Sequence, residues 1–375
     1  MANWDAIVIG LGGAGSAAAY HLARSGCRVL GIDQYPAVHP FGSSHGKTRI
    51  IRQAYFEDVA YVPLLRRAYE LWNQLEQSSE QKLYHRTGLI ELGPANGVVI
   101  PGVLRSAAEH GLEVQQLSIA EVQRRWPGIV GREDWLAVIE QNAGYLNVEA
   151  CVRSHLQQAE LASATLRHAQ AVRSWRVDGN AVTVTTDHGV ECAGRLVIAG
   201  GPWSASLLGP IGVPLQVLRK HQYWYSPEQS GYRQSDGFPC FFHETPNGYY
   251  YGFPSIDDAG VKVARHSGGT KIAGPTLEGG VDDEDRSLVE RFVDNYLPGV
   301  GSRLTAQLGC YYTVTKDENF IVDLHPDHEQ VVIVAGLSGH GFKFTSVLGE
   351  LASQLAIDGS TTLETSFLGI GRFKS

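Results

Sequence analysis

The segment from Asp5 to Asp33 constrains the fold more than any other part of this 375-residue chain. Ala6 to Ile9 form a β-favouring run, the turn Gly10-Leu11-Gly12-Gly13-Ala14-Gly15 follows, and a helical pattern continues to Ser25. In this G-x-G-x-x-G spacing, Gly10 permits a tight turn, Gly12 lets the backbone approach a pyrophosphate, and Gly15 lets the helix pack against the strand. Asp33 ends the next strand pattern and can accept hydrogen bonds from a ribose hydroxyl. The segment predicts a parallel α/β dinucleotide-binding unit, and it suits FAD and NAD equally.

A second strand, glycine turn and helix lie near the C-terminus. The apolar run from Val331 to Ala335 precedes Gly336-Leu337-Ser338-Gly339-His340-Gly341-Phe342-Lys343, and a helical pattern opens at Thr345. Two such turns at opposite ends of a chain predict a long cofactor that is held at both ends. FAD is the favoured cofactor, with the second turn aiming backbone N–H groups at the flavin ring.

The remaining patterns predict two kinds of structure in separate parts of the chain. Helices are expected at Tyr61–Glu76, Gly97–His110, Ile119–Arg125 and Asn147–Leu161, and strands at Leu83–Leu92, Ala181–Thr185 and Arg195–Ala199. From Gln216 to Thr315, short strands rich in aromatic residues indicate a separate antiparallel layer. We therefore expect an α/β (α+β) fold, with a discontinuous Rossmann-like FAD-binding domain (residues 1–82, 145–215 and 316–375). An inserted substrate domain with a mixed or antiparallel β-sheet would comprise residues 83–144 and 216–315.

Charge and cysteine content exclude several classes of function. The formal net charge is -8 and the sequence has no long basic run, so nucleic acid is not an expected partner. The five cysteines are far apart and form no CxxC pair, which argues against a disulfide framework or zinc site and favours a reducing compartment. Ala6 to Ala23 has no formal charge, but its glycines favour a strand, loop and helix over a membrane span. We expect a cytoplasmic protein that does not bind membranes.

The loop from Gly42 to Arg52 combines a lysine and two arginines with small residues. A solvent-exposed basic loop would have the same composition. However, Ile50 and Ile51 indicate burial, and a buried arginine requires an anionic partner.

This run, Gly-Ser-Ser-His-Gly-Lys-Thr-Arg-Ile-Ile-Arg, resembles the flavin loop of the monomeric sarcosine oxidase family. That family includes N-methyltryptophan oxidase and pipecolate oxidases, which are FAD-dependent amine oxidases of the D-amino-acid-oxidase-like superfamily. The C-terminal segment Gly336–Lys343 is also similar, and the resemblance covers nearly the whole chain in order. Other similar stretches are Arg125–Gly128, Pro246–Pro254, Cys310–Thr313 and Asp317–Ile321.

The resemblance implies a role for each matching residue. Cys310 would carry FAD through a thioether to the 8α-methyl carbon, although a lone cysteine is more often a small buried hydrophobe. Arg52 and Lys343 would bind the substrate carboxylate, and Lys262 would assist oxygen reduction near flavin N5. His266 and Tyr251 would line the substrate cavity, and Arg49 would lie beside the flavin. The full set of predicted cofactor contacts is Gly10, Gly12, Gly15, Asp33, Ser43, Ser44, Thr48, Arg49, Val172, Gly200, Trp203, Cys310, Gly336, Gly339, His340, Gly341, Phe342 and Lys343.

The activity implied by the resemblance is oxidation of a secondary amine. The expected substrate is sarcosine or another N-methyl amino acid, which would be converted with dioxygen into the amino acid, formaldehyde and hydrogen peroxide by a monomeric enzyme. N-Methyltryptophan, a cyclic amine such as pipecolate, and transfer of electrons to an acceptor other than oxygen remain alternatives. The family often has an acid at the position of Lys47, histidine at Gln53 and an aromatic residue at Arg265, so these three departures leave the substrate preference open.

Overall fold

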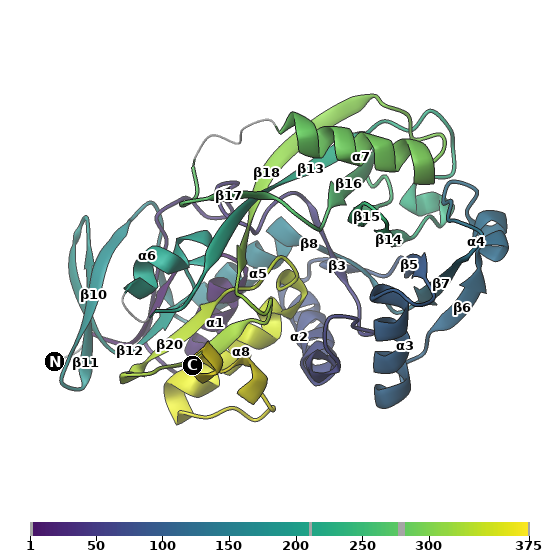
Figure 1. Ribbon diagram of the computed structural model, residues 1–375. Coiled ribbons are helices and arrows are strands. Elements are labelled where there is room, and N and C mark those ends of the chain that lie inside the picture. Colours follow the sequence, from purple (N-terminus) through teal and green to yellow (C-terminus); the bar gives the residue numbers. More distant parts are fainter. Residues whose placement is uncertain (1–2, 210–211, 277–281, 374–375) are drawn as a thin grey trace.

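The N-terminal glycine turn joins a buried strand to a helix, as the sequence predicts. The computed structural model describes residues 3–209, 212–276 and 282–373, and Figure 1 shows their arrangement. Strand β1 (Trp4–Ile9) pairs in parallel with β2 (Val29–Ile32) and with β12 (Gly189–Ile198). Because parallel strands are covered on both faces, their sequences are nearly continuous apolar runs.

The rest of this first sheet comes from the middle and the end of the chain. β9 (Thr165–Arg167) extends it beside β2, and β20 (His328–Ala335) pairs in parallel with β12. β19 (Ile321–His325) then pairs antiparallel with β20. β11 (Ala181–Thr186) pairs antiparallel with the first half of β12, and β10 (Val172–Asp178) pairs antiparallel with β11.

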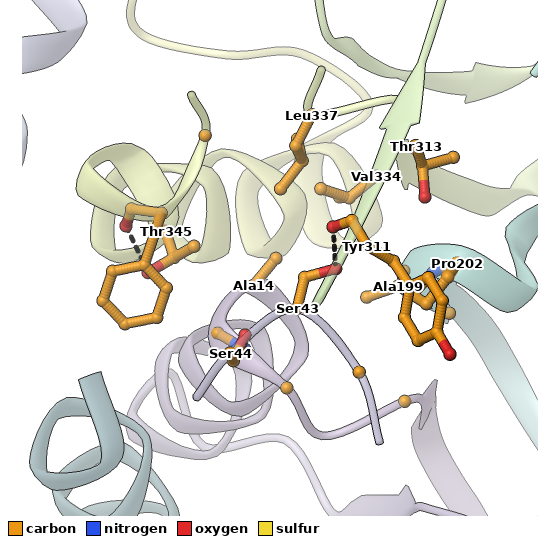
Figure 2. A pocket seen from close by; sticks show the side chains of 18 of the residues that line it. Ala14, Ser43, Ser44, Ala199, Pro202, Tyr311, Thr313, Val334, Leu337 and Thr345 are labelled. Atoms are coloured by element: carbon orange, nitrogen blue, oxygen red, sulfur yellow. Dashed lines mark hydrogen bonds between the residues drawn. The ribbon is translucent and has the colours of Figure 1, made fainter. Parts of the chain in front are cut away.

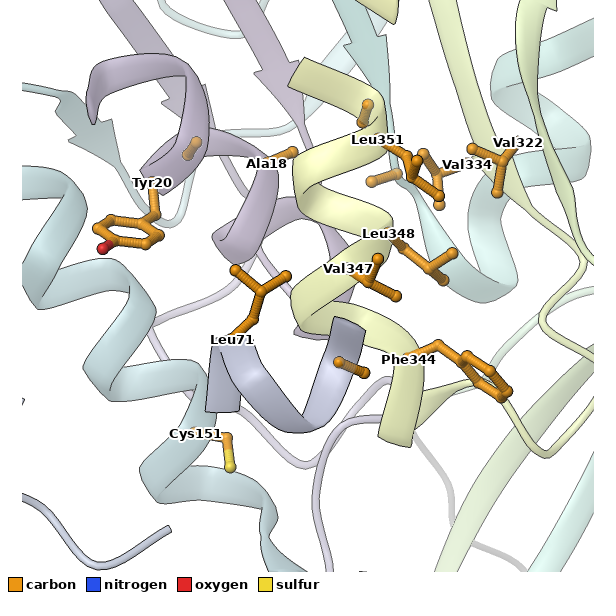
Figure 3. Packing of buried hydrophobic residues seen from close by; sticks show 14 of the residues in the cluster. Ala18, Tyr20, Leu71, Cys151, Val322, Val334, Phe344, Val347, Leu348 and Leu351 are labelled. Atoms are coloured by element: carbon orange, nitrogen blue, oxygen red, sulfur yellow. The ribbon is translucent and has the colours of Figure 1, made fainter. Parts of the chain in front are cut away.

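Four helices pack together against this sheet. They are α1 (Gly13–Arg24), α2 (Val62–Ser79), α5 (Val148–Leu161) and α8 (Thr345–Asp358). Figure 3 shows Leu71, Val347 and Leu351 in the apolar cluster between them. A Cβ atom on Gly349 would lie only 2.4 Å from the Cβ of Ala17, so the backbones of α1 and α8 are nearly in contact. The first and last α-helices of the described residues therefore form one layer.

The second sheet has the strand order β17-β13-β16-β15-β14-β5-β7-β6, and β18 pairs along the length of β13. Helix α7 (Asp283–Tyr296) covers one part of it through Val289, Phe292 and Val293, and α3 (Val99–His110) and α4 (Ile119–Arg125) pack nearby. The strand bounds are β5 (Leu89–Pro94), β6 (Gln115–Ser118), β7 (Trp135–Glu140), β13 (Gln216–Tyr225), β14 (Cys240–Thr245), β15 (Gly248–Phe253), β16 (Val261–Arg265), β17 (Thr270–Ile272) and β18 (Leu304–Val314).

A small third sheet lies between the other two and carries the basic loop. Its order is β3 (Thr48–Ile51), β8 (Gly144–Asn147) and β4 (Tyr84–His85), with all pairs antiparallel. The short helix α6 (Ser204–Leu208) follows the 3₁₀ turn η2 (Gly201–Trp203), and the 3₁₀ turn η5 (Phe342–Phe344) leads into α8.

The mixed α/β fold class is confirmed, and two sequence expectations need correction. The stretch from Leu83 to Leu92 is not one strand, because β4 and β5 belong to different sheets. The expected layer of short strands from Gln216 to Thr315 also contains α7, whose residues Val289, Phe292 and Val293 repeat at helical spacing. The proposed domain boundaries stay a prediction, and residues 210–211 and 277–281 within them lie outside the described residues. No helix in the described ranges combines the length and apolarity that crossing a membrane requires.

Candidate active site

One elongated cavity of about 260 Å³ is lined by both glycine turns. It extends from Gly10 and Asp33 past the loop Gly42–Ser44 to Arg52, His266 and Lys343. Figure 2 shows Ala14, Ser44 and Thr313 around the part of the cavity where the two turns approach each other. A ligand that contacts both glycine turns and the Arg52 end would have to be a long one.

The N-terminal turn has the geometry that its glycines predict. Gly10 has φ +87°, which favours glycine, and a Cβ atom on Gly15 would lie 1.7 Å from the carbonyl oxygen of Gly10. A Cβ on Gly12 would meet only Ser44 Oγ, at 3.5 Å, so the protein itself leaves room there. The Asp33 carboxylate accepts hydrogen bonds from Leu11 N at 2.7 Å and Tyr35 N at 2.9 Å, which fixes the turn.

The loop before β3 is tied to both ends of the chain. Ser44 Oγ accepts a bond from Gly13 N at 3.0 Å, and Ser43 Oγ donates to Tyr311 O at 2.7 Å, as Figure 2 shows. The Arg49 guanidinium donates to Thr48 O at 2.9 Å and to Ser43 O at 2.8 Å. The loop therefore holds Arg49 against the cavity while it joins α1 to β18.

The C-terminal turn is fixed by a glycine in the left-handed region and by side-chain hydrogen bonds. Gly339 has φ +83°, and a Cβ there would lie 2.3 Å from the Tyr312 ring, so only glycine fits. Lys343 Nζ donates to His340 O at 2.7 Å, and the carbonyl of Lys343 accepts a bond from Trp72 Nε1 at 2.9 Å. Helix α2 thus anchors the backbone at Lys343, and the carbonyl of His340 holds its ammonium.

Two cations meet at one end of the cavity. Arg52 is 3% exposed and Lys343 is 5% exposed, and both lie over the Tyr55 ring, at 4.7 Å and 5.1 Å from its centroid. Burial and the charge of Arg52 lower the pKa of Lys343 to about 7. Glu57 accepts a bond from Arg52 at 2.5 Å. Burial alone would raise the pKa of Glu57, but Arg52, His340 and Lys343 lower it to about 2. This end can bind an anion that displaces Glu57.

Aromatic side chains line the cavity beside these cations. They include Phe242, Tyr251, His266 and Tyr312, and His266 Nδ1 lies 3.4 Å from Tyr312 Oη. Burial lowers the pKa of His266 to about 3, and burial raises the pKa of Tyr251 to about 12. Both side chains are therefore neutral near pH 7 and can contact a ligand without changing its charge.

Lys262 is buried behind the basic loop and is not among the residues that line the cavity. Its ammonium donates to Gly46 O at 2.6 Å, Thr48 O at 3.0 Å and Thr48 Oγ1 at 3.2 Å. It lies 4.8 Å from the Phe253 ring centroid and 5.2 Å from that of Trp224. Burial, followed by the charge of Arg49, lowers its pKa well below the usual lysine value.

The structure brings most of the predicted residues together around the cavity. Those in its lining are Gly10, Gly12, Asp33, Ser43, Ser44, Arg49, Arg52, Val172, Gly200, Trp203, Tyr251, His266, Gly336, Gly339, His340, Gly341, Phe342 and Lys343. Gly15 supports the turn from behind. Cys310 and Thr48 are buried without lining the cavity, whereas Tyr311 and Tyr312, which follow the cysteine, do line it.

Comparison with known proteins accounts for this arrangement. A family model described as FAD dependent oxidoreductase matches residues 5–355. The chain belongs to the FAD-dependent oxidoreductase family. It is 40% identical to monomeric sarcosine oxidase of Bacillus sp. (strain B-0618), over 99% of this chain and 96% of that protein. It is 37% identical to N-methyl-L-tryptophan oxidase of Citrobacter koseri (strain ATCC BAA-895 / CDC 4225-83 / SGSC4696), over 99% of both chains.

Solved structures with the same fold include NikD, an unusual amino acid oxidase essential for nikkomycin biosynthesis. Its TM-score is 0.87 at 24% identity, covering 98% of both chains. Glycine oxidase from Geobacillus kaustophilus has a TM-score of 0.81 at 19% identity, covering 98% of both chains. At these identities the likeness shows the fold alone.

The residues of this FAD-dependent oxidoreductase fit its cofactor. The space left by the absent Cβ of Gly12 and the carboxylate of Asp33 suit a pyrophosphate and a ribose at one end of the cavity. At the other end, Gly339, His340 and Gly341 of the C-terminal turn line the same cavity. The cavity that joins the two turns is the observation that supports a dinucleotide of FAD length.

The sequence did not identify several residues at the cationic end of the oxidoreductase cavity. The sequence indicated only that a buried Arg52 needs an anionic partner. In the structure that partner is Glu57, five residues further along the chain, and Glu91 Oε1 lies 3.6 Å from Arg52 Nε. Phe242 and Tyr312 also line this end. The short spacing from Arg52 to Glu57 was a usable signal, whereas the contact with Glu91 depends on how separate strands are placed.

The three departures from the family pattern have different surroundings. Lys47 forms an ion pair with Asp257, and Gln53 N donates to Glu140 at 2.9 Å. Arg265 precedes His266, and among the described residues its Nε is buried without a hydrogen-bond partner. Two of the three adjoin residues that line the oxidoreductase cavity, because Gln53 follows Arg52 and Arg265 precedes His266.

Proposed function

We propose that this FAD-dependent oxidoreductase oxidises the secondary amine of an N-methyl amino acid, sarcosine first among them. The products would be the demethylated amino acid, formaldehyde and hydrogen peroxide. The observation that carries this proposal is the pair of buried cations, Arg52 and Lys343, beside neutral aromatic side chains in a cavity that both glycine turns line. The names of the relatives, monomeric sarcosine oxidase and N-methyl-L-tryptophan oxidase, support the same substrate class.

The side chains would act mainly by positioning the substrate. Arg52 and Lys343 bind its carboxylate through charge-assisted hydrogen bonds, after Glu57 has released the Arg52 guanidinium. His266 and Tyr251 contact the amine end, and His266 is uncharged near pH 7, so it does not compete for the amine proton. Because the amine can bind in its neutral form, no side chain has to act as a general base.

FAD, when bound, supplies the two-electron acceptor for the N-methyl carbon and passes the electrons to dioxygen. We infer that Lys262 stabilises the negative charge that develops on dioxygen as it is reduced. Its ammonium is already desolvated and is held by Gly46 O and Thr48 O, so little reorganisation is needed. We further propose that Cys310 forms the thioether to FAD and that the enzyme acts as a monomer in the cytoplasm.

The test is anaerobic bleaching of the bound flavin by a panel containing sarcosine, N-methyltryptophan and pipecolate, followed by a peroxide assay in air. We expect sarcosine or another small N-methyl amino acid to bleach the flavin and hydrogen peroxide to form in equal amount to the amine consumed. Bleaching by none of these amines would refute the proposal. Bleaching without peroxide would assign a dehydrogenase instead.

A further inference from the structure

A second buried acid, Glu91, lies beside Arg52 at the cationic end of the cavity, and the proposed reaction does not use it. The Arg52 guanidinium lies between the rings of Tyr55 and Phe56, at 4.7 Å and 4.6 Å, and one terminal nitrogen donates to Glu57. Its Nε lies 3.6 Å from Glu91 Oε1, which is too long for a hydrogen bond. In the part of the chain that the structure describes, neither of these two buried atoms has a hydrogen-bond partner.

Glu91 lies in the interior of the second sheet, where an acid is unusual. It occupies the middle of β5, is 1% exposed, and is paired with Phe242 of β14 and with Val138 of β7. Phe242 lines the cavity, so its strand neighbour Glu91 lies directly beneath the cationic end. A buried ionised carboxylate needs full hydrogen bonding, and a neutral acid costs far less at such a position.

The charged groups that face Glu91 come from three further elements. Arg52 and Glu57 follow β3, Glu140 ends β7, and Lys343 belongs to η5. Burial raises the pKa of Glu91 to about 8, and Glu140 and Glu57 oppose the lowering by Arg52 and Lys343. Glu140 is different, because its carboxylate accepts bonds from Gln53 N and Ala54 N.

Ionisation of Glu91 would change what Arg52 can bind. Glu57 is already a carboxylate at neutral pH, so a charged Glu91 would set a second carboxylate against the same guanidinium. A substrate carboxylate would then meet two like charges in a dry site, where such repulsion is strong. With Glu91 neutral, only Glu57 has to be displaced.

We propose that Glu91 is a further positioning residue for the substrate carboxylate. Glu91 acts in its protonated form, and it takes up a proton when the substrate carboxylate binds to Arg52. The inference rests on the proposed carboxylate site at Arg52 and Lys343. It predicts that substrate recognition weakens in alkaline solution not only through Lys343 but also through Glu91, which never touches the substrate.

Proton uptake on binding provides a direct test in the FAD-loaded enzyme. The probe is methoxyacetate, a carboxylate with an ether in place of the amine, so the ligand itself does not titrate above pH 6. Calorimetric titration at pH 8.5 in two buffers of different ionisation enthalpy gives the number of protons taken up per ligand. At that pH Lys343 is almost fully deprotonated and contributes about one proton, and Glu91 contributes roughly 0.7 more.

The variants E91Q and E91V both fix the position as neutral, and the second suits a buried strand. We expect each to take up roughly 0.7 fewer protons than the native enzyme while still binding methoxyacetate. E244Q is the matched control, because Glu244 is on β14 of the same sheet but accepts bonds from Val98 N and Val99 N, and it should leave the proton number unchanged.

The possible failures are distinguishable. If E91Q and E91V take up as many protons as the native enzyme, the role of Glu91 is overturned and the carboxylate site stands. If methoxyacetate fails to bind the native enzyme, or binds Arg52→Ala equally well, the carboxylate site is wrong and the inference fails with it.

Discussion

Alanine at Gly12 and at Gly15 should separate the role of the glycine turn in packing from its role in binding FAD. At Gly15 the new Cβ would lie 1.7 Å from the carbonyl oxygen of Gly10. Reaching a tolerable 3.0 Å requires a shift of 1.3 Å, the difference between the two distances. Both sides of the contact are backbone, because Gly10 directly follows β1 and Gly15 lies in the first turn of α1. Overpacking of this kind costs about 1–3 kcal/mol.

At Gly12 the same substitution meets no obstacle within the protein. The nearest atom is Ser44 Oγ at 3.5 Å, and the backbone angles of φ -69° and ψ -160° suit alanine. The apoprotein should therefore keep its stability, or gain up to about 1 kcal/mol from the lower entropy of the unfolded chain. A Cβ at this point would instead occupy the space proposed for the pyrophosphate. Loss of a hydrogen bond to a charged group, about 1.5–3 kcal/mol, corresponds to roughly 10- to 150-fold weaker FAD binding.

Both variants would be made in a Cys310→Ala background, so that FAD binding is reversible. The melting temperature of the apoprotein should fall by about 2 °C or more in Gly15→Ala. In Gly12→Ala it should stay level or rise. Fluorescence titration with FAD should show weak binding for both. Unchanged FAD affinity in Gly12→Ala would refute the approach of the pyrophosphate at this residue. An unchanged melting temperature in Gly15→Ala would refute the packing argument.

Three further predictions follow from the contacts around the cavity. Cys310→Ser should release all flavin into the supernatant after acid precipitation, whereas the native protein should stay yellow; free flavin from the native protein would disprove the thioether. Lys262→Met should slow reoxidation of the flavin by dioxygen at least about 100-fold, which corresponds to about 2.7 kcal/mol of activation free energy. Anaerobic reduction by substrate should stay nearly unchanged, and stopped-flow spectroscopy measures both steps. Equal reoxidation rates in the variant and the native enzyme would remove the role of Lys262 in oxygen reduction. Trp72→Phe leaves Lys343 O without its buried donor and should lower the free energy of unfolding by about 1–3 kcal/mol in urea titration, a result that an unaltered midpoint would contradict.

The sequence predicted those parts of the fold that depend on local patterns. The strand, glycine turn and helix at each end could be identified because the spacing of Gly10, Gly12 and Gly15 and the apolar run before Gly336 are short-range signals. Helix α7 carried a usable signal as well, with Asp282 as N-cap and Val289, Phe292 and Val293 on one face. It was missed because aromatic strands surround it in the sequence.

The environment of the cationic end could not be predicted in the same way. Glu91 contacts Arg52 only because β5 pairs with β14 in a particular register, which no pattern within residues 89–94 specifies. Likewise, Lys262 reaches Gly46 and Thr48 across more than 200 positions of the chain. Such contacts depend on the relative placement of sheets, whereas periodicity only indicates which side of an element is buried.

The close packing of α1 and α8 has a consequence for how the protein is made. Gly349 lies against Ala17, so α1 is covered by a helix that is synthesised more than 300 residues after it. Until residues 336–358 emerge from the ribosome, β20 is missing beside β12 and the N-terminal turn lacks the opposite wall of its cavity. Contacts between such distant segments form late in folding. FAD should therefore bind only after α8 has emerged, and nascent chains that stop before residue 336 should carry none.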